Sequence, residues 1–173
     1  IAATGHALAG GALVVLTGDV RIGVDGPYKV GLNEVAIGMP VPLLAMELAR
    51  ARLTPLDLTR ATLGAHIYTP AEAVPAGYLD RVVAADALAA EALAEANRLG
   101  ALPRTAYAPT KQRLRGATIE LIRSGFEVDV ARALGRCMHA SAADIALRPA
   151  AEAAGYHSEA RLCGLKEASI KPA

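Results

Sequence analysis

The feature that most restricts the fold is an apolar segment, GHALAGGALVVLTGD at residues 5–19, which contains a glycine pair and ends at an aspartate. Its longest apolar stretch, about ten residues with glycines inside, is too short to cross a membrane. Glycine is unfavourable inside a helix, so we expect a helix that begins near Gly10 and reaches Leu16. Two explanations for the pair remain open. It forms a turn or packing position, or it exposes the first helical amides to an anion or a developing oxyanion.

The composition predicts one domain whose core is built from small and aliphatic side chains. Hydrophobic residues make up 53% of the 173 residues, but only five tyrosines and one phenylalanine are aromatic. We therefore expect helices that pack closely at small residues. The net charge of +1, without a block of like charges, gives no reason to expect a nucleic-acid partner. Cys137 and Cys163 lack metal-like spacing and are expected to be reduced thiols, which favours a cytoplasmic location.

Local patterns predict strands mainly in the first 35 residues and helices after them. Thr54 and Thr69 each precede a proline, as helix N-caps do, and Glu72 completes a capping box with Thr69. We expect a domain over residues 1–134 and a tail of uncertain structure over residues 135–173. The expected strands cover residues 1–4, 19–24, 28–32 and 78–83; the expected helices cover residues 10–16, 43–53, 54–63, 69–77, 86–101, 107–115 and 118–134, with a weak helix or two beyond residue 137.

Among the ionisable residues Glu34 is the strongest candidate for chemistry. It lies among apolar neighbours, and an apolar pocket would raise the pKa of its carboxyl towards that of a general base. The alternative is an exposed loop glutamate. We expect Asp19 to pair with Arg21 or to cap a nearby backbone group. Arg52 is expected on a solvated helix face or at an interface, and Lys111 is expected to be solvated or to contact a phosphate. The histidines are too dispersed for a metal site, and no nucleotide-binding glycine motif is present.

Four segments together resemble the enoyl-CoA hydratase/isomerase (crotonase) family. They are GHALAGGALVVLTGDVRIG, GLNEVAIGMPVP, TPAEAVPAGYLDRVV and ALPRTAYAPTKQRLR, in the family's order and at fitting distances. The resemblance implies an α/β fold, a partial ββα spiral followed by a helical carboxy-terminal region. It also implies an acyl-CoA thioester as substrate or ligand, no further cofactor, and assembly into trimers or pairs of trimers. The family's amino-terminal half would precede Ile1, so we expect the carboxy-terminal part of a longer protein.

The resemblance also assigns roles to individual residues. Gly10 falls on the backbone donor that stabilises the thioester oxyanion, and Glu34 falls on the second of two catalytic glutamates. The first glutamate of the family's hydratases is replaced here by Leu13, and Asn33 replaces a proline that is frequent before the second. Leu8 and Ala9 would line the substrate-binding site together with Gly10, Leu13 and Asn33.

One glutamate suffices to move a proton between carbons 2 and 4 of an enolate, whereas hydration benefits from two. We therefore expect 3-enoyl to 2-enoyl isomerisation rather than hydration. A non-catalytic acyl-CoA-binding or assembly protein, or a fragment inactive by itself, are the alternatives.

Overall fold

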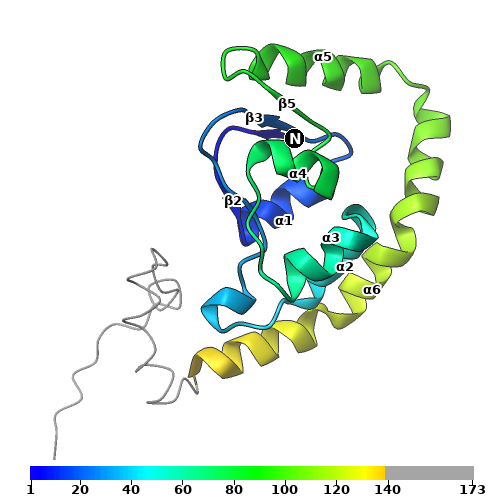
Figure 1. The fold of residues 1–173 in the computed structure, drawn as a ribbon. Coiled ribbons are helices and arrows are strands. Elements are labelled where there is room, and N and C mark those ends of the chain that lie inside the picture. Colours follow the sequence, from blue (N-terminus) through cyan, green and yellow to red (C-terminus); the bar gives the residue numbers. More distant parts are fainter. Residues whose placement is uncertain (139–173) are drawn as a thin grey trace, which may run out of the picture. The chain divides into compact units, whose positions relative to one another are not determined.

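The computed structural model describes residues 1–138 and divides the chain into two compact units, Ile1–Phe126 and Glu127–Ala173. The expected tail of residues 135–173 lies almost wholly outside the described residues, and the domain boundary near residue 134 stays a prediction. The first unit contains short strands and several helices (Figure 1). The elements are β1 (Ala2–Ala3), β2 (Ala7–Leu8), α1 (Gly10–Thr17), β3 (Ile22–Val24), β4 (Val30–Gly31), the 3₁₀ turn η1 (Val35–Ile37), α2 (Leu43–Arg52), α3 (Pro55–Thr62), α4 (Pro70–Ala76), β5 (Arg81–Val83), α5 (Leu88–Gly100) and α6 (Arg104–Met138).

Two small parallel sheets organise the strands. One has the order β1-β3-β5, and the other pairs β2 with β4. Strands were expected at β1, β3, β4 and β5, and they are confirmed. Strand β2 was not expected, because two residues are too few to show the alternation of apolar and polar side chains that predicts a strand.

The core is aliphatic and rich in alanine, as the composition predicted. Ala12 of α1 and Ala45 and Ala49 of α2 are fully buried, so these two helices approach each other through small side chains. The two largest fully buried side chains are nevertheless aromatic, Tyr68 and Tyr78. Their rings lie 5.4 Å apart between centroids.

Side-chain caps fix the start of α3 and α4. Thr54 accepts a hydrogen bond from the Asp57 amide, and Thr69 forms the predicted capping box with Glu72. Helix α4 ends at Gly77, whose φ of 96° is left-handed and whose Cβ would lie 2.5 Å from the Arg52 carbonyl oxygen. This position therefore requires glycine on both conformational and steric grounds.

Two expected charge arrangements are wrong. Arg21 pairs with Asp80 rather than with Asp19; Nη2 lies 2.7 Å from Oδ1, and the Arg21 side chain is 7% exposed. Arg52 does not lie free on a solvated helix face, because it is partly buried and its guanidinium donates to the carbonyl oxygens of Leu16 and Gly18, and its alternative place at an interface stays a prediction. Arg52 thus satisfies backbone acceptors at the carboxyl end of α1, where the helix dipole favours a cation.

The expected division between helices 107–115 and 118–134 is also wrong. Residues 104–138 form the single helix α6, which continues through Pro109 and Gly116. One glycine in a helix costs only about 1 kcal/mol, which is too little to end it. No helix in residues 1–138 is both long and apolar enough to cross a membrane.

Candidate active site

The pairing of β2 with β4 creates the candidate site. The two strands are parallel, with Leu8 opposite Gly31, so their carboxyl ends lie at the same edge. The chain leaves β2 directly into α1 at Gly10, and it leaves β4 into Asn33 and Glu34. Segments that are more than twenty residues apart in the sequence therefore meet at the edge where ligands of parallel sheets usually bind.

An unusual backbone conformation precedes the first turn of α1. Ala9, the N-cap residue, has φ 46° and ψ −117°, a positive-φ conformation that costs a non-glycine residue roughly 1–3 kcal/mol. Its amide donates to the Gly31 carbonyl oxygen at 3.0 Å, and its carbonyl accepts from the Leu13 amide at 3.0 Å. Unlike α3 and α4, α1 has no capping side chain. Its first amides therefore have no intrahelical acceptor and no side-chain cap.

Within residues 1–138, neither a steric contact nor the backbone conformation requires glycine at this pair. A Cβ added at Gly10 or Gly11 would meet no atom from elsewhere in the described residues within 4 Å, and neither glycine has a positive φ. The open space beside the pair leaves room for another molecule to approach the helical amides. Both explanations of the pair stay predictions.

Glu34 is buried, with a relative exposure of 5%, so the alternative of an exposed loop glutamate is wrong. It starts the turn η1, and its carbonyl oxygen accepts from the amides of Ile37 at 3.1 Å and Met39 at 2.9 Å. Gly38, with φ 79°, ends this turn in the left-handed conformation. The turn therefore fixes the backbone that carries the Glu34 carboxylate.

The other predicted site residues lie around the same edge. Leu8 ends β2 and is half-buried, and Leu13 lies one helical turn after Gly10, packed against the core. Asn33 directly precedes Glu34, and its buried Oδ1 has no hydrogen-bond partner among residues 1–138. All six predicted positions thus belong to the two segments that leave β2 and β4. Their functional roles stay predictions.

Tyr78 is a buried polar residue near this site that the sequence patterns did not indicate. Its hydroxyl faces the Leu32 backbone but has no hydrogen bond of ordinary geometry in the described part of the chain. Burial raises the pKa of this hydroxyl above its usual value, with smaller contributions from Tyr68 and the charge of Glu34. The chain has only six aromatic residues, and this rarity was the one feature of the sequence that could have drawn attention to Tyr78. No group of three histidine, cysteine, aspartate or glutamate side chains with metal-site geometry occurs in residues 1–138.

Comparison with known proteins gives the family. The enoyl-CoA hydratase/isomerase model matches residues 1–147, and the chain belongs to this family. Human mitochondrial enoyl-CoA delta isomerase 1 is 33% identical over 130 residues, which are 75% of this chain and 43% of that protein. The mouse enzyme of the same name is 30% identical over 130 residues.

Solved structures agree on the fold. An enoyl-CoA hydratase/isomerase family protein from Pseudomonas syringae superposes with a TM-score of 0.70 at 40% identity, over 72% of this chain and 54% of that one. Human mitochondrial delta3-delta2-enoyl-CoA isomerase gives 0.71 at 31% identity, over 76% and 52%. The expected crotonase fold is confirmed. The chain spans less than half the length of the curated relatives it matches and about half of these structures.

Proposed function

We propose that this chain carries the base and one oxyanion donor of an enoyl-CoA isomerase that acts on acyl-CoA thioesters in fatty acid metabolism. The observation that carries the proposal is the parallel pairing of β2 with β4, which brings the uncapped start of α1 and the buried Glu34 to one edge. The similarity to delta isomerases supports the same chemistry.

The proposed reaction moves one proton and one double bond. The Glu34 carboxylate removes a proton from carbon 2 of a 3-enoyl thioester, and the electron pair of that C–H bond forms a dienolate. The Gly10 amide donates to the thioester oxygen, where the negative charge develops. Protonated Glu34 then returns the proton to carbon 4, which gives the 2-enoyl thioester and regenerates the carboxylate.

Leu13 favours isomerisation over hydration. It occupies the position of the hydratases' first glutamate and packs against the core, so it offers no acid or base one turn after Gly10. A single carboxylate is sufficient for a proton shuttle. We further propose a trimer or hexamer as the assembly, a cytoplasmic location, and a second oxyanion donor outside the matched half of the family. Loss of that donor would cost about 2.7–4 kcal/mol of transition-state stabilisation.

The experiment compares Glu34→Gln with Glu120→Gln in the protein of natural length. Glu120 lies on α6 in a surface pair with Arg123, which makes it a matched control for the change of charge. Formation of the conjugated 2-enoyl thioester is followed by ultraviolet absorbance. We expect Glu34→Gln to lower kcat about 10²- to 10⁴-fold and Glu120→Gln to leave it unchanged. Equal activity in both variants would refute the role of Glu34.

The second candidate function is acyl-CoA binding without turnover, which the loss of a glutamate at Leu13 also favours. Calorimetric titration with a 3-enoyl-CoA and with a 2-enoyl-CoA separates the two functions. Tight binding without any isomerisation by the wild-type protein selects the binding function.

A further inference from the structure

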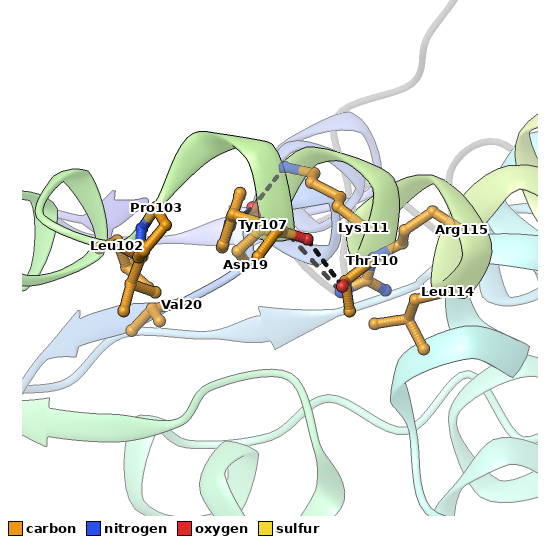
Figure 2. Close-up of a pocket in the computed structure, with 11 residues that line it drawn as sticks. Asp19, Val20, Leu102, Pro103, Tyr107, Thr110, Lys111, Leu114 and Arg115 are labelled. Atoms are coloured by element: carbon orange, nitrogen blue, oxygen red, sulfur yellow. Dashed lines mark hydrogen bonds and ion pairs between the residues drawn. The ribbon is translucent and has the colours of Figure 1, made fainter.

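A pocket of about 430 Å³ lies at the far end of α1 from the candidate active site. Figure 2 shows the residues that line it. Helix α1 begins at Gly10, whereas the pocket includes Asp19 and Val20, just after the helix ends. The opposite side comes from the end of α5 and the first turns of α6. The volume falls within the range of 300–1,000 Å³ that small-molecule sites occupy. The lining residues are Asp19, Val20, Leu99, Leu102, Pro103, Ala106, Tyr107, Thr110, Lys111, Leu114 and Arg115.

One side of the pocket is a charged cluster around Asp19. The Tyr107 hydroxyl donates to Asp19 Oδ2 at 2.7 Å, and the Lys111 ammonium pairs with the same oxygen. Arg115 Nη2 lies 3.7 Å from Asp19 Oδ1, within ion-pair range but beyond hydrogen-bond range. Partial burial opposes ionisation of Asp19, but the hydrogen bonds from Lys111 and Tyr107 and both cations outweigh it, and its pKa is lowered.

The cluster carries more positive than negative charge. Lys111 and Arg115 together bring two positive charges against the single carboxylate of Asp19. Arg52 is a further cation near Arg115. Burial, and then the charge of Arg115, lower the pKa of the Arg52 guanidinium to about 10. The excess positive charge makes the pocket electrostatically complementary to an anion.

Donors remain available for such an anion. An ammonium has three N–H bonds and a guanidinium five, and Asp19 takes up one of Lys111 and none of Arg115 at hydrogen-bond distance. The Lys111 side chain is 46% exposed, so its remaining donors can be reached from solvent.

The other walls are apolar. Val20, Pro103 and Ala106 line the pocket beside three leucines, of which Leu102 and Leu114 are exposed. Leu114, next to Arg115 on α6, is 72% exposed. Exposed leucines beside cations with unused N–H donors suit a molecule with an apolar body and one charged end.

We infer that this pocket binds an amphipathic monocarboxylate, an unbranched apolar chain that ends in one carboxylate. The guanidinium of Arg115 matches a carboxylate with two parallel N–H donors, and Lys111 supplies a second charge. Arg52 is not among the lining residues and donates to the carbonyl oxygens of Leu16 and Gly18, so the lining itself carries an excess of one positive charge. A monoanion balances this excess, whereas a phosphate dianion would exceed it. The ligand carboxylate lies on the solvent side of the two cations, away from Asp19. This site is separate from Glu34 and does not rest on the proposed function.

The test is calorimetric titration of the natural-length protein with decanoate and with decan-1-ol, which has the same chain but no charge. Arg115→Gln is compared with Arg113→Gln, an exposed position of α6 outside the pocket lining. We expect decanoate to bind, decan-1-ol to bind at least tenfold more weakly, and Arg115→Gln to lower decanoate affinity at least tenfold. Arg113→Gln should bind as the wild type does.

A second pair of variants changes the volume and leaves the charges intact. Ala106→Phe places a ring in the pocket, and Ala108→Phe places the same ring on an exposed part of α6 outside the lining. Only Ala106→Phe should abolish decanoate binding. The inference is overturned if the wild type does not bind decanoate, if decan-1-ol binds equally well, or if Arg115→Gln and Ala106→Phe both bind as the wild type does.

Discussion

The substitution Gly10→Ala separates a functional glycine from a structural one. A Cβ at Gly10 meets no atom within 4 Å and requires no change of φ. Alanine is favoured over glycine inside a helix by about 0.5–1 kcal/mol, and by less at a first position. We therefore expect the free energy of unfolding of Gly10→Ala to equal that of the wild type or to exceed it by at most about 1 kcal/mol.

Gly77→Ala is the matched comparison, and the structure predicts the opposite result. Left-handed backbone costs alanine about 1–2 kcal/mol. The contact of 2.5 Å between the new Cβ and the Arg52 carbonyl oxygen forces a backbone shift, which adds about 1–3 kcal/mol. The two contributions together predict a loss of about 2–5 kcal/mol. Urea unfolding of both variants, analysed by linear extrapolation, measures the difference.

The activity of Gly10→Ala then tests the proposed role. The new methyl group occupies space through which a thioester oxygen would reach the helical amides, so we expect kcat to fall about 10²-fold without loss of stability. Gly100→Ala, which also has no atom within 4 Å of the new Cβ, should leave activity unchanged. A destabilisation of Gly10→Ala by more than 1 kcal/mol would refute our interpretation, because it would show that glycine is needed for the fold.

Three further predictions concern buried and paired polar groups. Asp80→Asn leaves Arg21 buried without its carboxylate partner and should lower the free energy of unfolding by about 2 kcal/mol. The loss is smaller than for a fully buried pair because the Asp80 side chain is 38% exposed. In the same urea titration, the surface change Glu120→Gln should alter the free energy of unfolding by under about 0.5 kcal/mol. Because the pKa of Asp19 is lowered in the folded state, its stabilising contribution is present above its ordinary pKa of 3.8 and is lost as the pH falls through its folded-state pKa. The difference in unfolding free energy between the wild type and Asp19→Asn should therefore shrink below about pH 4. A difference that does not vary with pH would contradict the ion cluster. Tyr78→Phe removes a buried hydroxyl without a hydrogen bond of ordinary geometry, so its thermal unfolding midpoint should stay the same or rise, and a drop equivalent to more than about 1 kcal/mol would reveal a partner for that hydroxyl.

The sequence predicted those features of the fold whose causes are local. The caps at Thr54 and Thr69 act over three residues, so the starts of α3 and α4 were found correctly. A helix end at residue 115, just before Gly116, was predicted wrongly, because α6 continues through this glycine. One glycine is a weak signal beside the helical preference of its neighbours.

Long-range pairing was beyond local patterns. Asp19 was assigned to the nearby Arg21, but its ionic partner Lys111 lies 92 residues further along the chain. Likewise, the burial of Glu34 depends on what packs around η1, so the sequence left the choice between an exposed and a buried glutamate open. The meeting of Gly10 and Glu34 rests on β2, a strand of two residues that no periodicity indicates.

The central claim is that Glu34 transfers the proton of an acyl thioester whose oxygen is held by the start of α1. The most direct test is the incorporation of deuterium at carbon 2 of a 3-enoyl thioester in deuterated water, followed by NMR with wild-type protein of natural length and with Glu34→Gln. Our account predicts rapid incorporation with the wild type and none above the uncatalysed rate with Glu34→Gln. Incorporation at the wild-type rate with Glu34→Gln would contradict it.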